Sequence, residues 1–236
     1  YMADFLDSAI KARLNILICG GAGSGKTTLL NILSSSIPDD ERIITIEDAA
    51  ELKLKQEHVI SLETRNNNYE ENGEVSVRDL LINSLRMRPD RIIIGEVRGK
   101  EAFDMLQAMN TGHEGSITTL HANSSKDALN RLESMVLMSN IELPIKAIRE
   151  YIVNTIDLVV HVERLSDGKR KIMAITEIDD LKDDVIETKD IFGFNINGIT
   201  QNKEVDGEFI KYDMIPKCLN KFHSKGIFDV DFMFNK

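Results

Sequence analysis

A glycine-rich segment near the start of the chain constrains its fold more than any other feature. Residues 20–28 read Gly-Gly-Ala-Gly-Ser-Gly-Lys-Thr-Thr and follow an apolar run at residues 14–19. They match G-x-x-x-x-G-K-[ST], a pattern that stands between a strand and a helix and wraps a phosphate in backbone N–H groups. Lys26 can reach the β- and γ-phosphates, and the Thr27 hydroxyl can ligate Mg²⁺. The alternative is a glycine-rich turn with an incidental lysine.

The motif therefore predicts a site for ATP and Mg²⁺. The residues expected to contact the nucleotide are Gly21, Ala22, Gly23, Ser24, Gly25, Lys26, Thr27 and Thr28.

Composition narrows the class of protein. The 236 residues suit one large domain, or one domain with a small appendage, and 42% hydrophobic residues suffice for a substantial core. No stretch approaches the roughly 18 apolar residues of a membrane span, and no signal peptide is recognisable. The net charge of −10 disfavours a motor that tracks duplex nucleic acid, which would more often carry a basic footprint.

Strand and helix signals alternate along the first three-fifths of the chain. Apolar periodicity predicts helices at residues 2–13, 25–35, 77–87, 100–109, 126–138 and 144–154, and strands at residues 14–19, 42–46, 59–62, 91–94 and 116–120. Short apolar strands that alternate with helices are typical of an α/β fold with a mostly parallel sheet covered by helices.

The regular alternation of strand and helix signals ends after residue 157. Two strands at residues 158–165 and 171–178 are predicted to form a hairpin, residues 193–207 are polar and turn-rich, and residues 216–225 suggest a short helix. Residues 177–190 hold seven acidic residues and two lysines, which indicates a solvated hairpin face or an acidic docking surface. We predict a core at residues 1–156 and a small β-rich extension, packed on it, at residues 157–236.

Two carboxylates lie at the carboxyl ends of predicted strands. Glu96 comes after residues 91–94, and Glu47 comes after residues 42–46. Strand carboxyl ends meet at one edge of a parallel sheet, beside the phosphate-binding loop. There a carboxylate can orient or deprotonate a water, or join Thr27 in holding Mg²⁺. The alternative for Glu96 is an exposed strand-end carboxylate.

Two histidines, His113 and His121, flank the predicted strand at residues 116–120. A single histidine is more often structural, but a pair in a Gly/Thr-rich setting favours phosphate sensing or communication between subunits. No Cys/His set has the spacing of a zinc site.

Taken together, these blocks resemble the secretion ATPases of bacterial type II and type IV systems and their pilus relatives. They are similar to that family's Walker A, Asp box, Walker B and His box, in the family's order. Residues 46–52, 85–90 and 190–194 resemble the CpaF-type branch, which assembles tight-adherence (Flp) pili. Ala22, where this branch usually has Thr, and Asn66, in a stretch often rich in Pro, are small departures.

The resemblance implies a RecA-like P-loop NTPase that works as a homo-hexameric ring. It implies an inner-membrane platform protein as partner, a peripheral location at the cytoplasmic face of the inner membrane, and no nucleic acid. An amino-terminal domain that closes over the nucleotide is expected before Tyr1 in the full-length protein. A RecA-like nucleic-acid motor and a nucleotide-binding regulatory module without turnover are the alternatives.

The resemblance also assigns roles within the site. Glu96 and Glu47 would share the positioning of water and metal, Arg86 is a further candidate for charge compensation or subunit contact, and the histidines would relay nucleotide state. The residues assigned to hydrolysis are Glu96, Glu47, Arg98, Arg65, His121 and His113.

Overall fold

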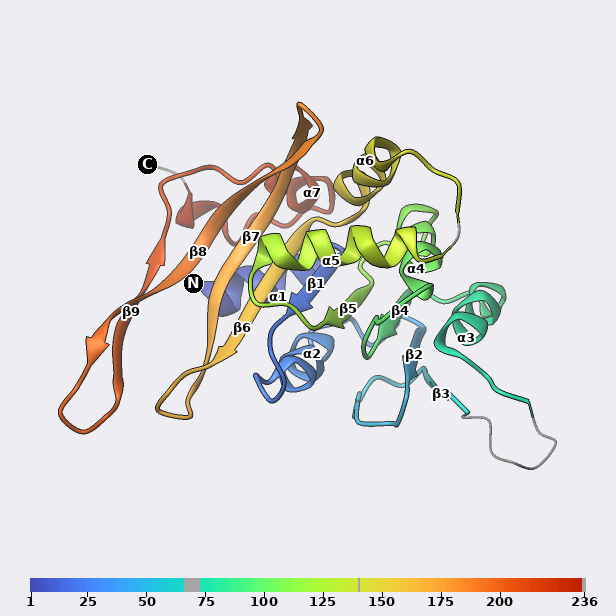
Figure 1. Ribbon diagram of the computed structural model, residues 1–236, viewed down its shortest axis with the longest axis horizontal. Helices are drawn as coiled ribbons and strands as arrows, with labels where there is room; N and C mark the ends of the chain where they lie inside the picture. The colour runs from blue at the N-terminus through green and yellow to red at the C-terminus, as the bar shows by residue number, and fades with distance from the viewer. Residues whose placement is uncertain (66–72, 140, 235–236) are drawn as a thin grey trace.

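Short runs of aliphatic and β-branched residues form the centre of one mixed sheet of nine strands, ordered β3-β2-β4-β5-β1-β6-β7-β8-β9 (Figure 1). The computed structural model describes residues 1–65, 73–139 and 141–234, so Asn66 lies outside the described residues. The parallel strands are β1 (Ile16–Cys19), β2 (Ile43–Glu47), β3 (Val59–Glu63), β4 (Arg91–Ile94), β5 (Ile117–Leu120) and β6 (Leu158–Arg164). The antiparallel strands are β7 (Arg170–Lys182), β8 (Val185–Ile199) and β9 (Val205–Lys211).

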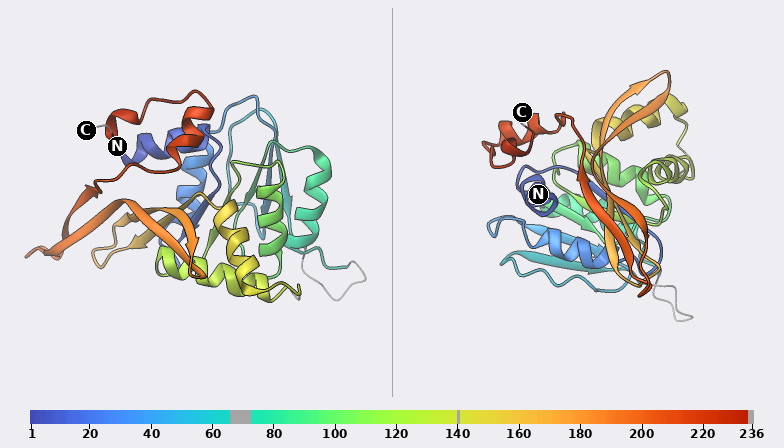
Figure 2. Two further views of the ribbon diagram at one scale, coloured as in Figure 1. Left: turned by 90° about the horizontal axis from the view of Figure 1, so that it is seen from above. Right: turned by 90° about the vertical axis from the view of Figure 1, so that its left-hand side faces the viewer.

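Helices cover both faces of the sheet. The α-helices are α1 (Met2–Lys11), α2 (Lys26–Ser34), α3 (Val77–Ser84), α4 (Glu101–Asn110), α5 (Ser125–Leu137), α6 (Ile145–Thr155) and α7 (Leu219–Ser224). Two short 3-10 helices are η1 (Leu85–Met87) and η2 (Asp231–Met233). Helices α1, α2 and α7 pack on one face, and α3 to α6 pack on the other (Figure 2). The predicted α/β fold with a mostly parallel, helix-covered sheet is confirmed.

Strand β1 is apolar at every position because both of its faces are buried. Ile16 and Ile18 belong to the hydrophobic cluster under α1 and α2, whereas Leu17 and Cys19 belong to the cluster under α4 to α6. A central strand buried on both faces needs apolar side chains at every position. Burial raises the pKa of the Cys19 thiol to about 12, as expected for a small core residue.

The carboxyl-terminal strands continue the same sheet. Strand β6 pairs in parallel with β1, so the sheet is continuous across the predicted boundary between residues 156 and 157. The hairpin of β6 and β7 and the helix α7 are confirmed. Residues 193–207, predicted to be polar and turn-rich, are mostly strand, because β8 runs to Ile199 and β9 begins at Val205, with a turn between them. Cross-strand pairing supports this polar stretch, which joins the end of β8 to the edge strand β9 and has many exposed positions.

The acidic segment 177–190 forms the end of the β7–β8 hairpin. Asp183 and Asp184 make its turn, with φ of 50° and 60°. The Arg149 guanidinium of α6 donates to the Asp184 carbonyl, and Lys189 pairs with Asp179 at 2.6 Å. Asp179 therefore has a cationic partner within the chain, and so does Asp184, whose carboxylate lies 3.7 Å from Lys146 Nζ. No helix in the described part of the chain is both long and apolar enough to span a bilayer.

Candidate functional site

The glycine-rich loop leaves β1 and enters α2 at the edge where the parallel strands end. Gly23 and Gly25 adopt φ of 69° and 99°, a backbone region that favours glycine, and Gly25 caps α2 without a side-chain hydrogen bond. The N–H groups of residues 25–28 donate to no acceptor among the described residues. Ser24 Oγ is buried and also lacks a partner there. Unpaired donors at a helix N-terminus suit an anion.

Lys26 is held against this loop. Its side chain is buried, and Nζ lies 3.1 Å from the carbonyl oxygens of Gly20 and of Gly21. Nζ is also 3.3 Å from His121 Nδ1. Burial lowers the pKa of the Lys26 ammonium, and the negative charge of Glu96 opposes that shift. The cation is therefore positioned by weak acceptors that an anionic ligand could replace.

Glu47 ends β2 and lies almost wholly inside the protein. Its Oε1 accepts from the backbone N–H groups of Glu51 at 3.0 Å and Leu52 at 3.1 Å. Burial raises the pKa of the Glu47 carboxyl, and these two hydrogen bonds partly oppose the shift. A Cβ at Gly95 would lie only 3.1 Å from Glu47 Cγ. The missing side chain at Gly95, just after β4, therefore leaves room for Glu47.

Glu96 is bound on one side by Arg98. Arg98 Nε and Nη2 lie 2.9 and 2.6 Å from Glu96 Oε2, and Arg98 Nη1 lies 2.8 Å from Asp48 Oδ2. This places Arg98 between two carboxylates of its own chain, which raises the pKa of the guanidinium. Glu96 Oε1 lies 2.9 Å from His121 Nε2, but it accepts no hydrogen bond from the described residues. Glu96 therefore contacts Arg98 through one carboxylate oxygen and His121 through the other.

The two histidines lie at opposite ends of β5. His121 follows the carboxyl end of the strand and touches both Lys26 and Glu96. His113 precedes the amino end, and its Nδ1 lies 3.3 Å from the Ala108 carbonyl. The structure therefore brings His121, and not His113, to the phosphate-binding loop.

Two predicted arginines lie outside the cluster. Arg65 Nε and Nη2 donate to the Gly73 carbonyl at 3.0 and 2.9 Å. Arg86 is exposed in η1, which precedes the amino end of β4 and so lies at the edge opposite Glu96. Neither arginine joins the loop within this chain, and a role between subunits stays a prediction.

Arg170 reaches the loop and was missed in the sequence. It opens β7, and its Nε donates to the Gly23 carbonyl at 3.0 Å across 147 positions. No local pattern could have revealed this contact, because it depends on how β7 lies against β6. Asp48, the partner of Arg98, lies in the acidic segment that follows residues 42–46, but the sequence assigned it no role of its own.

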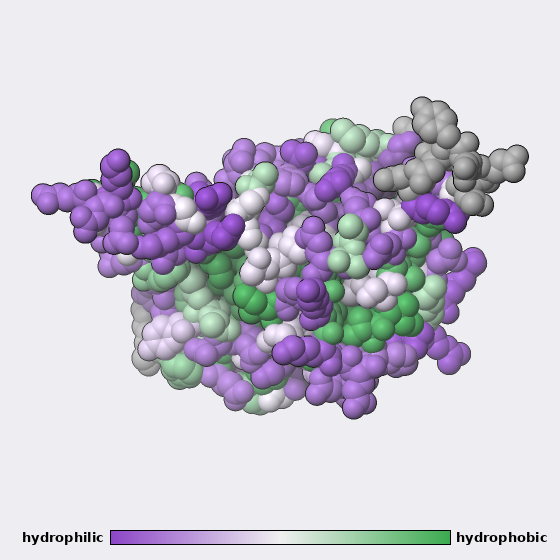
Figure 3. Space-filling model, turned by 90° about the horizontal axis from the view of Figure 1, so that it is seen from below, coloured by the Kyte–Doolittle hydropathy of each residue, from purple (hydrophilic) through white to green (hydrophobic). Residues whose placement is uncertain are grey.

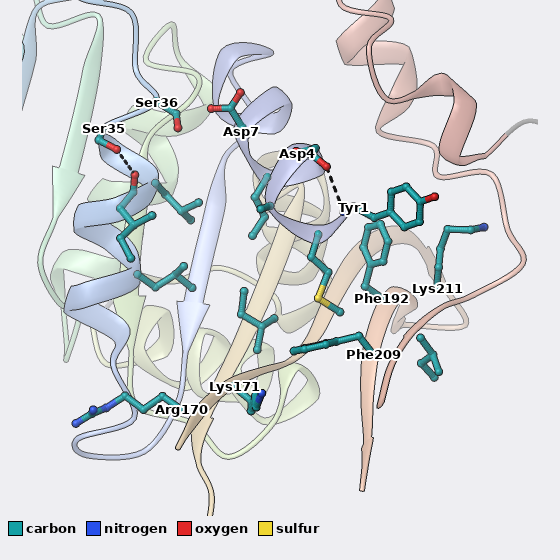
Figure 4. A pocket seen from close by; sticks show the side chains of 18 residues that line it. Tyr1, Asp4, Asp7, Ser35, Ser36, Arg170, Lys171, Phe192, Phe209 and Lys211 are labelled. Carbon is teal, nitrogen blue, oxygen red and sulfur yellow. Dashed lines mark hydrogen bonds and ion pairs between the residues drawn. The ribbon is translucent and has the colours of Figure 1, made fainter. Parts of the chain in front are cut away.

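Arg170 lines two pockets, and the smaller of them also adjoins the loop. One of about 270 Å³ is lined by Gly23, Gly25, Lys26, Thr27, Thr28, Glu51 and Arg170. A larger pocket of about 830 Å³ lies between α1, α2 and the strands β7 to β9, and Arg170 also lines it (Figure 4). Figure 3 views the molecule from the side on which the parallel strands end; hydrophilic side chains predominate there, with hydrophobic areas between them.

Comparisons with known proteins agree on one family. The family model described as "Type II/IV secretion system protein" matches residues 1–203. A putative conjugal transfer protein of Mycobacterium tuberculosis is 43% identical over 166 residues, which cover 70% of this chain and 47% of that protein.

Two solved structures are similar as well. The VirB11 ATPase of the Brucella suis type IV secretion system, in complex with sulphate, has a TM-score of 0.67 at 38% identity over 74% of this chain and 51% of that one. The pilus retraction motor PilT with bound ADP has a TM-score of 0.56 at 26% identity over 71% and 48% of the two chains. The chain thus spans about half the length of the proteins that it matches.

Proposed function

Since the chain belongs to the type II/IV secretion system protein family, we propose that it hydrolyses ATP to ADP and phosphate as part of a motor for pilin assembly or protein export. The motor would be a hexameric ring at the cytoplasmic face of the inner membrane, acting with a platform protein. Residues 46–52 and 85–90, which resemble the tight-adherence branch, support an Flp pilus as the system.

One observation carries this proposal: the unpaired N–H groups of residues 25–28 and the buried Lys26 lie at the same sheet edge as Glu47 and Glu96. The relatives supply independent support, because the VirB11 structure contains sulphate, a tetrahedral oxyanion like phosphate, and the PilT structure contains ADP. The unpaired Ser24 hydroxyl and the open backbone around Gly23 fit such a group.

Binding would follow from groups already in place. The N–H groups of residues 25–28 would donate to phosphate oxygens. Lys26 Nζ, which now donates to the Gly20 and Gly21 carbonyls, would donate to phosphate oxygens in their place. Thr27 would hold Mg²⁺, with Glu47 or Glu96 acting directly or through water. Bound Mg²⁺ neutralises charge on the β- and γ-phosphate oxygens.

Water activation would fall to the two carboxylates. Glu47 is buried and fixed by two backbone N–H groups, and its raised pKa makes it a better proton acceptor than an exposed glutamate. One oxygen of Glu96 is held by Arg98, and the other lies 2.9 Å from His121 Nε2. Arg98 therefore positions Glu96, and His121 joins Glu96 to Lys26.

The Lys26→Ala variant tests this function. It deletes the cation that faces the phosphates, so we expect ATP hydrolysis to be abolished and nucleotide binding to weaken strongly. Binding would be followed with a fluorescent ATP analogue and turnover by phosphate release. Lys225→Ala, which removes an exposed lysine beside α7, should behave like the wild type. Wild-type turnover in Lys26→Ala would exclude the proposed site.

A further inference from the structure

Arg170 crosses from the carboxyl-terminal strands to the phosphate-binding loop. Its Nε donates to the Gly23 carbonyl at 3.0 Å, and its Cδ lies 2.9 Å from the place that a Cβ of Gly25 would occupy. A side chain at Gly25 would therefore obstruct this approach. Figure 4 shows the Arg170 side chain directed toward the start of α2 and away from Lys171 and Phe209.

The rest of the Arg170 guanidinium has no partner in the described structure. Arginine carries five N–H donors, and only the one on Nε is used here. Among the described residues no carboxylate forms an ion pair with Arg170, including Glu51, which lines the same pocket. Arg98, by contrast, is neutralised by Glu96 and Asp48. Arg170 thus brings an uncompensated positive charge to the pocket that contains Lys26 and Thr27.

We propose that Arg170 is a phosphate-binding residue of the nucleotide site, supplied in cis by the hairpin of β6 and β7. Its free guanidinium N–H groups would donate to phosphate oxygens of the bound nucleotide, while Nε keeps the Gly23 carbonyl turned outward. The inference rests on the proposed function, because it takes the loop to be a nucleotide site. It adds a contact that joins the loop to the antiparallel strands.

Through this contact, bound nucleotide would also affect the carboxyl-terminal strands. Arg170 is the first residue of β7, and β7 pairs with β8 along most of its length. A phosphate bound to Arg170 would restrain the start of β7. Nucleotide binding would therefore slow backbone exchange at residues 170–172, far along the chain from the loop.

The experiment compares Arg170→Gln and Arg170→Lys in the full-length protein. Dissociation constants for a fluorescent ATP analogue would be measured at two salt concentrations, together with hydrogen–deuterium exchange with and without nucleotide. Lys169→Gln is the matched control, because it makes the same charge change one residue away, where Nζ pairs with Glu204 at 3.0 Å. Lys26→Ala reports on the nucleotide site itself.

We expect Arg170→Gln to weaken binding about tenfold, the loss of one charge-assisted hydrogen bond. Its binding should also depend less on salt, because one cation no longer contributes. Arg170→Lys should retain more affinity because it keeps the charge, and Lys169→Gln should match the wild type. Nucleotide should protect residues 170–172 in the wild type and not in Arg170→Gln.

Three results would overturn the inference. Wild-type affinity in Arg170→Gln, with binding lost in Lys26→Ala, would reject the role of Arg170 and leave the proposed function intact. If Arg170→Gln and Arg170→Lys lost the same amount of nucleotide affinity and both had lower thermal stability without nucleotide, Arg170 would only stabilise the loop and would not bind phosphate. Wild-type binding in Lys26→Ala would reject the nucleotide site, and the role of Arg170 with it.

Discussion

At the scale of single residues, the missing side chain of Gly95 is coupled to the position of Glu47. In Gly95→Ala the new Cβ would lie 3.1 Å from Glu47 Cγ, closer than an ordinary contact. Glu47 is held by two backbone N–H groups, so a displaced side chain would lose its alignment with them. We expect hydrolysis to fall about tenfold or more while the fold persists, because small misplacements of catalytic groups are costly. Gly99→Ala, whose Cβ would meet only Glu101 Oε2 at 3.5 Å, is the control for phosphate-release assays.

The roles of the two strand-end carboxylates can be distinguished by replacing each with glutamine, which has the same size but no charge. In Glu96→Gln, ATP should still bind while hydrolysis falls by roughly 10²-fold or more, in line with the loss of a general base. Single-turnover rates with saturating nucleotide measure this directly. A much larger loss in Glu47→Gln than in Glu96→Gln would assign the base to Glu47 and leave Glu96 to the metal.

At the scale of one element, β6 carries a buried histidine beside the loop. His161 pairs in register with Cys19, and burial lowers the pKa of its imidazole, with the nearby Glu163 opposing the shift. The folded state therefore binds fewer protons than the unfolded state below the ordinary histidine pKa of about 6.5. This contribution to stability is present above that pH and is lost as the pH falls through the folded-state pKa.

His161→Gln should remove that part of the pH dependence. Urea unfolding at pH 7.5 and pH 5.5 would compare the wild type with this variant and with His58→Gln, which alters an exposed histidine. We expect a smaller loss of unfolding free energy on acidification in His161→Gln only. A loss equal to that of the wild type would show that His161 is not the titrating group.

At the scale of the whole molecule, a buried ion pair joins segments that are far apart in the sequence. Arg91 is fully buried, and its Nε and Nη2 lie 2.6 and 2.9 Å from the Glu41 carboxylate. Arg91 Nη1 also donates to the carbonyls of Ile10 and Gly115. The guanidinium therefore ties α1 and the segments before β2 and β5 to the amino end of β4.

Removing one partner of this pair should be strongly destabilising. Glu41→Ala leaves a buried guanidinium without its counter-charge, which typically costs about 3–5 kcal/mol of unfolding free energy. Urea denaturation would measure the loss, and Glu57→Ala, at an exposed glutamate, is the control. A cost below about 1 kcal/mol would mean that water or another carboxylate compensates Arg91.

The sequence by itself determined the features that depend on neighbouring residues. The loop at residues 20–28, the strand–helix alternation and the placement of Glu47 and Glu96 at one edge were predicted correctly, because parallel strands bring their carboxyl ends together. The hairpin of β6 and β7 was also predicted correctly, because its two strands are adjacent in the sequence. The polar end of β8 and strand β9 were not, because these stretches are largely exposed and are supported by cross-strand pairing and not by an apolar pattern.

Only the tertiary structure decided which side chains meet. His113 and His121 are close in the sequence, yet a four-residue strand places them at opposite edges of the sheet. Arg98 faces carboxylates of its own chain, and Arg170 reaches the loop from 147 positions away. Arg98 also meets Asp48 across 50 positions, and it is the register and packing of the strands that set such long-range contacts.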